Sequence, residues 1–341
     1  MKDRGEGRRR GIDAPRSQVT AADGILLIDK DQGVTSHDVV AAIRRLAATR
    51  KVGHAGTLDP MATGLLTIGI GSATRLLTYL VGADKTYEAT IRLGQTTSTE
   101  DADGDITSHD GVRLDSGFLL ALESAMADLT GPQAQIPSAV SAIKVDGVRA
   151  YDRVRHGEDV QLEARDITVY AFDRLDHPLA DIAEDGTAVV DCQVRVRCSS
   201  GTYIRALARD LGKAMGCGAH LTALRRTHVG AMDVGEAHSI ASLNDDVRSQ
   251  EGEDCPKPIT TIPMGQVAQA VCQCVMLSDS DVRALRYGQF LDRSILDNAV
   301  SPPTASHLTD AWAGLDSHGN LVAMLVRRGR HVRPVCVFPT S

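Results

Sequence analysis

A single carboxylate in a glycine-rich loop is the strongest candidate for chemistry in this sequence. Asp59 lies in GHAGTLDPMATG, residues 53–64, just after a basic cluster and just before an apolar run. An aspartate before a proline is most often a turn residue, and that interpretation stays open. Gly56 and Gly64 allow close approach of the backbone to a ligand, and Pro60 restricts the conformation of Asp59. The pattern indicates a carboxylate on a stiff loop.

Two tyrosines and an arginine have types suited to the same site. Tyr87 stands in the alternating pattern KTYEATIRLG at 85–94, where a half-buried strand tyrosine is the plain alternative. Tyr203 and Arg205 are two residues apart, which separates them on a helix but allows both to point into one cleft from an extended first turn. Apolar neighbours favour a partly buried, paired Arg205 over an exposed one.

Three further patterns look like ligand sites, and each lacks a required residue. GIGSATR at 69–75 lacks the third glycine of a dinucleotide fingerprint and the Gly-Lys-Ser/Thr of a P-loop. DADGD at 101–105 begins like a calcium loop, but Ile106 replaces the glycine and Val112 the bidentate glutamate. SSG at 199–201 is not a nucleophile elbow. We therefore expect no cofactor and no metal, so that any enzyme here works with side chains alone.

Charge is distributed unevenly along the chain. The formal net charge of −7 argues weakly against nucleic acid as a partner. Acidic residues dominate 98–128, whereas basic residues dominate 195–228 and arginines 325–341. Basic stripes on an acidic chain can bind phosphates locally. Solvated basic faces are the alternative that charge alone leaves open.

Composition is that of a globular protein in a reducing compartment. The 341 residues are 43% hydrophobic and 24% charged, and the length favours two domains. Seven cysteines without a CxxC pair, and no signal peptide, indicate reduced thiols and a cytoplasmic location. The most apolar run is broken by Ser72, Arg75 and several glycines, so no membrane span is expected.

The elements that must hold these residues follow from periodicity and capping signals. Ser36 and Ser72 are predicted to cap helices, and Asp115 or Ser116 to start another. Strands are expected at 24–33, 65–71, 85–94, 166–176, 188–199 and 220–230, and helices at 37–50, 73–82, 116–130 and 201–216.

Domain boundaries follow from shifts in composition. Residues 1–22 form a polar, basic tail that we expect to be disordered. The first domain spans 23–243 and contains an irregular, polar arm at about 133–160. An acidic, proline-containing linker follows at 244–263, and a smaller domain of short strands with a helix near 279–287 covers 264–341. Strands and helices without regular βα alternation predict an α+β fold with a mixed sheet.

Several of these stretches together resemble one known family. GILLIDKDQGVTSHDVV, VGHAGTLDPMATGLLTIGIGSATR, KTYEATIRLGQTTSTEDADGD, QIPSAVSAIKVDGVRAY, CSSGTYIRALARDLG and HLTALRRTHVG occur in the order and at the spacings of the TruB family of tRNA pseudouridine synthases. The resemblance implies a mixed, mostly antiparallel sheet in a catalytic domain, a thumb arm inserted at about 133–160, and a small β-rich PUA-like C-terminal domain. It also implies cofactor-free isomerisation of uridine 55 in the tRNA T-arm.

The resemblance assigns roles to individual residues. Asp59 matches the catalytic carboxylate, Tyr87 the aromatic residue that stacks on the flipped base, and Arg205 the arginine that pairs with that carboxylate. Most of the acidic segment 98–128 is expected to face away from the RNA, and the role of the C-terminal domain stays open. Substrate-binding roles are implied for His54, Tyr203, Leu224, Lys144 and Arg149.

The expected partner is the T-arm of tRNA, met by a monomer without a membrane or a guide RNA. Two alternatives remain. In one, the same cleft binds or folds RNA without chemistry. In the other, the chain is the guide-RNA-dependent relative of a multi-protein particle, which the apparent thumb insertion disfavours.

Overall fold

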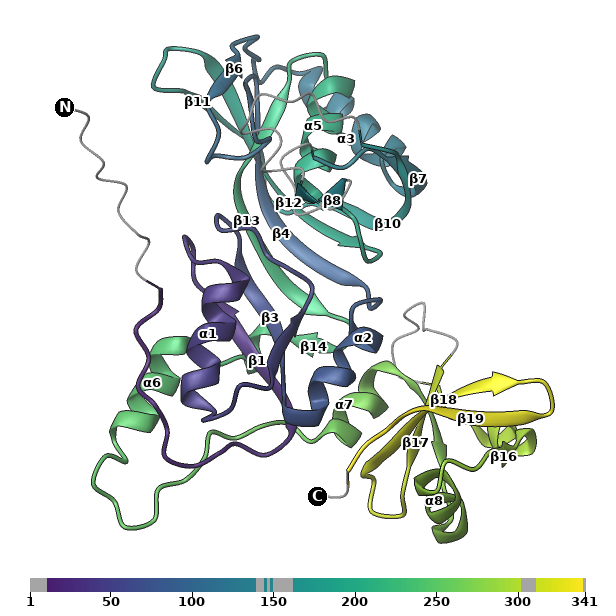
Figure 1. The fold of residues 1–341 in the computed structure, drawn as a ribbon. Helices are drawn as coiled ribbons and strands as arrows, with labels where there is room; N and C mark the ends of the chain where they lie inside the picture. The colour runs from purple at the N-terminus through teal and green to yellow at the C-terminus, as the bar shows by residue number, and fades with distance from the viewer. Residues whose placement is uncertain (1–10, 139–143, 146–147, 150–161, 302–310, 340–341) are drawn as a thin grey trace. The chain divides into compact units, whose positions relative to one another are not determined.

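The computed structural model describes residues 11–138, 144–145, 148–149, 162–301 and 311–339. The chain divides into two compact units. The first unit combines Met1–Ala83 with Val229–Ser341, and the second comprises Asp84–His228. Figure 1 gives the element labels. The α+β fold with a β-rich C-terminal part is as predicted.

In the first unit, β3 (Thr63–Ile70) pairs antiparallel with β1 (Gly24–Lys30) and with β2 (Val52–Ala55). Helix α1 (Ser36–Leu46) connects β1 to β2 and buries its apolar side, including Val39, as its amphipathic spacing predicts. The strands expected at 24–33 and 65–71 and the helix expected at 37–50 are present, although the helix ends at Leu46 and β2 was not predicted.

The predicted caps of two helices are wrong. Thr35, not Ser36, caps α1, since its hydroxyl accepts from the backbone of Asp38 and the Asp38 carboxylate accepts from Thr35. Ser72 lies within a 3₁₀ helix, η1 (Gly71–Arg75), and its hydroxyl donates to Asp23. The expected helix is therefore η1 followed by the short α2 (Leu77–Leu80).

The C-terminal part of the first unit is a separate sheet that shares a core with the N-terminal strands. Apolar side chains from β1, β3, α2, α7 (Met264–Val271) and this sheet form one buried cluster, with Leu27 and Met324 at 1% and 0% exposure. The sheet order is β15 (Gln273–Met276), β17 (Ala311–Leu315), β18 (Leu321–Arg328), β19 (His331–Val337) and β16 (Leu291–Asp292).

The remaining elements of the first unit lie between and beside these strands. Helix α6 (Ile240–Arg248) extends into the predicted 244–263 linker, so the first five residues of the linker are helical. The expected helix near 279–287 is α8, capped by Ser278. The bounds are β14 (Met232–Asp233), η2 (Val234–Glu236), α6 (Ile240–Arg248), α7 (Met264–Val271), α8 (Asp279–Arg286) and η3 (Arg293–Asn298).

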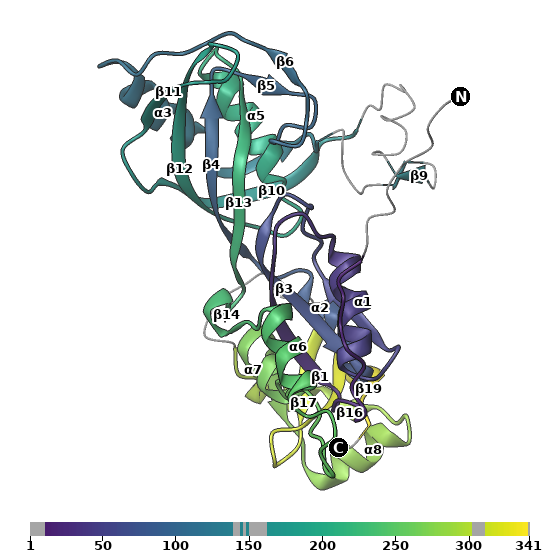
Figure 2. The same ribbon diagram turned by 90° about the vertical axis from the view of Figure 1, so that its left-hand side faces the viewer.

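The second unit is built on a sheet in the order β13 (Ala219–Val229), β4 (Lys85–Leu93), β12 (Ala188–Cys198), β10 (Arg165–Arg174) and β7 (Gly131–Gln135). Its central strands run side by side in Figure 2. Every second residue of β4 is buried, which is why the alternating sequence forms a strand with one face in the core.

Two helices and several short strands complete the second unit. Helix α3 (Phe118–Asp128) contacts α5 (Ile204–Ala214) and β10. The predicted irregular arm from 133 is wrong for residues 133–135, because β7 pairs with β10 as far as Gln135. Much of the arm lies outside the described residues. The short strands are β5 (Thr96–Thr97), β6 (Ile106–Ser108), β8 (Lys144–Val145), β9 (Val148–Arg149) and β11 (Leu179–Ile182).

Candidate active site

Asp59 occupies the loop between β2 and β3 and is a turn residue, as its sequence suggests. Its carbonyl oxygen accepts a hydrogen bond from the backbone of Ala62 over 3.1 Å. Gly56 and Gly64, on either side, have φ of +82° and +98°, angles that residues with a Cβ rarely adopt. The Asp59 side chain itself is half-buried. The turn therefore leaves a partly accessible carboxylate on a backbone that glycine alone allows.

The residues on both sides of Asp59 are fixed by the connection after β1 and by the first residue of α1. The Ser36 hydroxyl accepts from the backbone N–H of Leu58 over 3.0 Å and donates to its carbonyl over 3.2 Å. The carbonyl of Pro60 accepts from the Gly33 backbone over 2.7 Å. Sequence reasoning missed this use of Ser36, because a serine at a helix start is first read as a cap.

A buried lysine completes this brace. The Lys30 ammonium is fully buried and donates to the backbone carbonyls of Asp31 and Val34 over 2.9 and 2.8 Å. A third bond reaches the Pro60 carbonyl over 3.4 Å. Three carbonyl oxygens satisfy the buried charge, and in doing so they tie the connection after β1 to the Asp59 loop.

His54 lies on β2, two residues before the glycine that opens the loop. It stands opposite Ile68 of β3, and its half-buried ring meets the ring of His37 edge-on at 5.7 Å between centroids. The loop follows directly on the strand, so His54 and Asp59 belong to one short segment of the first unit.

In the second unit, Tyr87 and Leu224 lie on neighbouring strands. Tyr87 is on β4 and 8% exposed, and Leu224 is on β13 and 7% exposed. The hydroxyls of Thr222 and Thr227 on β13 donate to the carbonyls of Thr90 and Thr86 on β4, over 3.4 and 3.3 Å. The two strands therefore hold a tyrosine and a leucine in one neighbourhood, as a pocket for a planar base would need.

Arg205 is buried and paired, as its apolar neighbours predicted. In the first turn of α5 it is 4% exposed, and its guanidinium meets the Asp101 carboxylate at 3.4 Å. It also donates to the carbonyl of Thr99 over 2.9 Å and to the hydroxyl of Ser138 over 3.4 Å. A buried ion pair with added hydrogen bonds fixes the guanidinium in one orientation.

Asp101 is the partner that sequence reasoning missed. The Thr99 hydroxyl and the backbone of Asp103 both donate to its carboxylate, and its side chain is 6% exposed. The same residue opens the pattern that fails as a calcium loop. Its neighbour Glu100 pairs with Arg209 over 2.9 Å, so the start of the acidic segment packs against α5.

Tyr203 immediately precedes α5, where the side-chain amide of Gln135 holds its backbone. The Tyr203 N–H donates to the side-chain Oε1 of Gln135 over 2.9 Å, and the side-chain Nε2 of Gln135 donates to the Tyr203 carbonyl over 3.1 Å. Gly201 opens this approach with φ of +88°. Tyr203 therefore keeps extended backbone until the helix begins, as the two-residue spacing to Arg205 requires.

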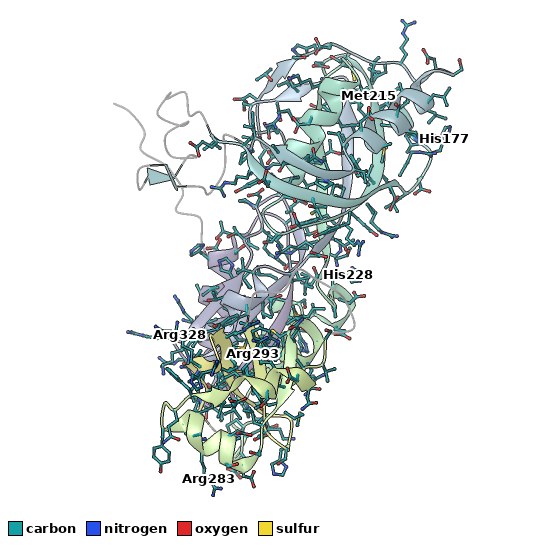
Figure 3. The ribbon with its side chains drawn as sticks, turned by 90° about the vertical axis from the view of Figure 1, so that its right-hand side faces the viewer. His177, Met215, His228, Arg283, Arg293 and Arg328 are labelled. Atoms are coloured by element: carbon teal, nitrogen blue, oxygen red, sulfur yellow. The ribbon has the colours of Figure 1, made fainter. Side chains whose placement is uncertain are left out.

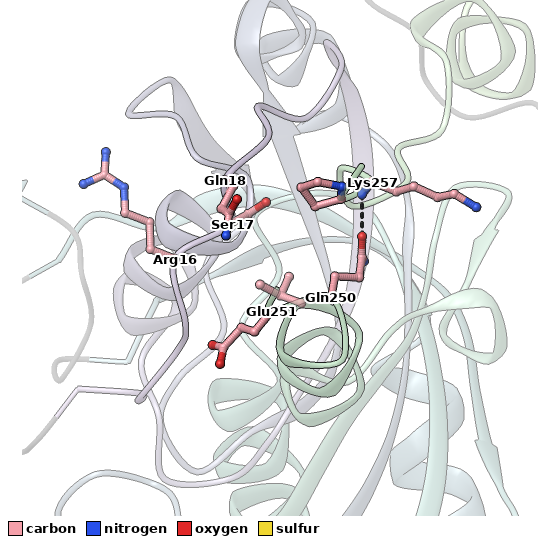
Figure 4. Close-up of a pocket in the computed structure, with 8 residues that line it drawn as sticks. Arg16, Ser17, Gln18, Gln250, Glu251 and Lys257 are labelled. Atoms are coloured by element: carbon pink, nitrogen blue, oxygen red, sulfur yellow. Dashed lines mark hydrogen bonds between the residues drawn. The ribbon is translucent and has the colours of Figure 1, made fainter. Parts of the chain in front are cut away.

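Lys144 and Arg149 are the predicted site residues that remain. Lys144 and Arg149 stand opposite each other in the β8–β9 pair, and their side chains lie outside the described residues. The C-terminal arginines of β18 and β19 are exposed, and Figure 3 labels one of them, Arg328. The same figure labels Arg283 of α8 and Arg293 of η3. A small pocket lined by residues such as Arg16 and Glu251 lies elsewhere in the first unit (Figure 4), where the Lys257 backbone donates to Gln250.

Among the described residues, no three His, Cys, Asp or Glu side chains are placed to hold a metal ion. No helix in the described part of the chain is long and apolar enough to cross a membrane.

Comparison with protein families identifies two adjoining matches. The N-terminal domain of TruB family pseudouridylate synthases matches residues 44–204, and the C-terminal domain of tRNA pseudouridylate synthase B matches residues 205–262. The tRNA pseudouridine synthase B of Arthrobacter sp. (strain FB24) is 48% identical over 93% of this chain and 97% of its own. The enzyme of that name from Streptomyces coelicolor is 52% identical over 94% and 98%.

Solved structures share the fold. An H/ACA ribonucleoprotein bound to a substrate RNA containing 2′-deoxyuridine matches with a TM-score of 0.66 at 24% identity, over 93% of this chain and 85% of the other. A Cbf5–Nop10–Gar1 complex matches with a TM-score of 0.65 at 25% identity, over 93% and 84%. At these identities the likeness establishes architecture only.

Proposed function

This chain belongs to the TruB family of pseudouridylate synthases, and from that premise we propose that it converts uridine 55 in the T-arm loop of tRNA to pseudouridine without a cofactor. Relatives between 41% and 54% identical are named tRNA pseudouridine synthase B, and the chain is accordingly a pseudouridine synthase. The position of the target uridine, the flipping of the base and the roles of single residues belong to the proposal.

The observation that carries the proposal is the braced carboxylate of Asp59. Pseudouridine formation breaks the bond between C1′ and N1, turns the uracil, and joins C1′ to C5. The C5 proton leaves and N1 regains a proton, so no electrons are exchanged. A carboxylate assists by bonding to the sugar or the base, or by stabilising a cationic sugar. A loop fixed on both sides of Asp59 is what such placement requires.

Arg205 is proposed to hold the Asp59 carboxylate ionised and correctly aimed. A guanidinium that is buried and already oriented by Asp101 donates from a fixed position. On this proposal Asp101 neutralises part of the charge of Arg205 and sets the angle from which the guanidinium donates to the catalytic carboxylate.

The base itself is proposed to lie against Tyr87, Tyr203 and Leu224. A uridine inside a folded RNA loop must leave its stack before an enzyme can reach it, at a cost of a few kcal/mol. Stacking on Tyr87 and an apolar wall at Leu224 return part of that energy, and His54 supports the opened loop. Lys144 and Arg149 are proposed to contact phosphates from the thumb.

The decisive experiment measures tritium release from C5-labelled uridine in a T-arm minihelix. Wild type is expected to release tritium, and Asp59→Asn to bind the RNA and release none. Asp31→Asn, which changes an exposed carboxylate near the same loop, is the matched control and is expected to retain full activity. Undiminished release by Asp59→Asn would contradict the mechanism.

Two other outcomes separate the alternatives. Tight RNA binding without release by wild type would favour an RNA-binding or RNA-folding role. Release that appears only when a guide RNA and accessory proteins are added would favour the guide-dependent form, whose fold this chain shares. The relatives named tRNA pseudouridine synthase B support the stand-alone enzyme.

A further inference from the structure

The start of β4 contains a buried ammonium that the proposed reaction does not use. Lys85 is 6% exposed, and its Nζ donates to the hydroxyl of Ser200 over 3.0 Å. Burial, and next the guanidinium of Arg226, lower the pKa of Lys85 to about 8, against smaller opposing effects of Cys198 and Asp84. Two cations thus lie near each other inside the second unit, with Arg226 only 1% exposed.

The surroundings of Lys85 coincide with the proposed base-binding residues. Lys85 and Tyr87 are two apart on β4 and share its buried face. Leu224 and Arg226 are likewise two apart on β13, the neighbouring strand. Tyr87 and Leu224 therefore each have a buried cation two residues away on their own strand, before Tyr87 on β4 and after Leu224 on β13.

Charged and titratable groups reach Lys85 from several elements. Asp84 precedes it on the chain, and burial together with the nearby Asp84 carboxylate raises the pKa of Tyr170 on β10. Cys198 of β12 stands directly opposite Lys85 in the strand register. Burial raises the pKa of the Cys198 thiol to about 12, so at neutral pH it is an uncharged neighbour.

Ser200 belongs to the segment that leads from β12 to Tyr203 and Arg205. Ser199, before it, exchanges two hydrogen bonds with the backbone of Thr168 on β10, at 2.8 and 2.9 Å. The Thr202 hydroxyl donates to the Ser199 carbonyl over 3.0 Å. The bond from Lys85 adds a tie between this segment and the strand that carries Tyr87.

Packing alone does not explain a lysine at this position. An ammonium buried beside a guanidinium raises the free energy of the folded state, and an apolar side chain of similar length would fill the same space without that cost. The presence of a charge at this position therefore indicates a use that packing does not supply.

We propose that Lys85 is a positioning residue for pseudouridine formation: through Ser200 its ammonium fixes residues 199–203 against the strand of Tyr87. Tyr87, Tyr203 and Arg205 then keep one mutual arrangement while the uracil turns between its two bonds. This inference rests on the proposed function, and it assigns Lys85 no contact with the substrate.

The test compares Lys85→Met, Lys85→Arg and Ser200→Ala with wild type in single-turnover tritium release. Lys85→Met is expected to slow the step at saturating RNA by at least thirtyfold and to leave the Kd for the minihelix within threefold. Lys85→Arg, which keeps a charged donor, is expected to recover part of the rate. Lys213→Met, a change at an exposed lysine of α5, is the matched control and is expected to behave as wild type.

A double-mutant comparison and a pH profile distinguish a positioning role of Lys85 from a purely structural one. Ser200→Ala should slow the step severalfold, and adding it to Lys85→Met should cause no further loss, because both changes remove one interaction. The wild-type rate should fall as the pH rises through about 8, where Lys85 loses its proton, and this limb should be absent in Lys85→Met.

Thermal stability of the Lys85→Met variant is the last measurement of the test. Since folding lowers the pKa of Lys85, the buried ammonium destabilises the folded state below about pH 8, and Lys85→Met should not lower the Tm at pH 7. A loss of rate that accompanies a large fall in Tm, additive effects of the two changes, or an unimpaired Lys85→Met would each overturn the inference. Absence of release by wild type would overturn the proposed function and this inference together.

Discussion

The two regions that carry the proposed site are held in opposite ways. The Asp59 loop is fixed chiefly by hydrogen bonds to backbone atoms, from Ser36, Gly33 and the Lys30 ammonium. The start of α5 is held by the Gln135 amide and also by side-chain charge, through Arg205 with Asp101 and Arg209 with Glu100. Hydrogen bonds to backbone atoms constrain where a residue lies. Ion pairs constrain its position too, and they also favour the charged form of the side chains that they join. The first region should therefore respond to changes in shape and the second to changes in charge.

The largest expected effect comes from the buried ion pair. Asp101→Asn keeps the shape of the side chain but removes its charge, so the Arg205 guanidinium stays buried without that counter-ion. Breaking such a pair costs ~3–5 kcal/mol of unfolding free energy. Urea unfolding followed by circular dichroism measures it, and the rate of tritium release should fall as well.

Double substitution sharpens that result. Asp101→Asn combined with Arg205→Met removes both charges and should recover part of the lost stability, without recovering activity. Equal stability of Asp101→Asn and wild type would show that charge does not hold this region, and the contrast between the two regions would fail.

The next effect comes from the backbone brace. Ser36→Ala removes both bonds to Leu58 and leaves a buried N–H and a buried carbonyl unsatisfied, at a cost of ~1–3 kcal/mol. Because these bonds fix the residue before Asp59, turnover should fall at least tenfold with little change in the Kd for RNA. Stopped assays at saturating minihelix measure the rate, and filter binding measures the Kd.

A matched serine substitution tests whether the brace acts through the loop. Ser72→Ala removes a hydroxyl that donates to Asp23 on the surface, away from Leu58, and should change the unfolding free energy by less than ~1 kcal/mol. A Ser36→Ala enzyme with wild-type turnover would mean that Gly33 and Lys30 fix the loop without the serine.

Local sequence predicted the elements well and their contacts poorly. The strands at Gly24–Lys30 and Lys85–Leu93 follow from local periodicity. The glycines of the GHAGTLDPMATG loop indicate backbone angles that other residues rarely adopt. Asp101 and Arg205 lie on separate segments of the chain, so only the tertiary fold brings their charges together. Short-range pattern assigns a helix but not the partner of a buried arginine.

The serine at position 36 shows how two local signals compete. Thr35 and Ser36 both favour a helix N-terminus, and the capping box formed by Thr35 with Asp38 was the stronger pattern in the sequence. Once Thr35 takes the cap, Ser36 occupies the first helical turn, and its hydroxyl is available to Leu58 in the following connection. The misassignment of one residue thus hid the brace of the candidate catalytic loop.

The smallest expected effect separates the two ion pairs of the second unit. Glu100→Gln breaks the pair with Arg209, whose side chain is 30% exposed and also contacts Asp210 at 2.9 Å. Water and the second carboxylate compensate, so the loss should be ~0.2–1 kcal/mol and should shrink in high salt. The loss from Asp101→Asn should instead persist in high salt, because that pair excludes water and counter-ions. Denaturation at two salt concentrations measures both, and equal salt sensitivity would show that burial is not what distinguishes the pair that orients Arg205.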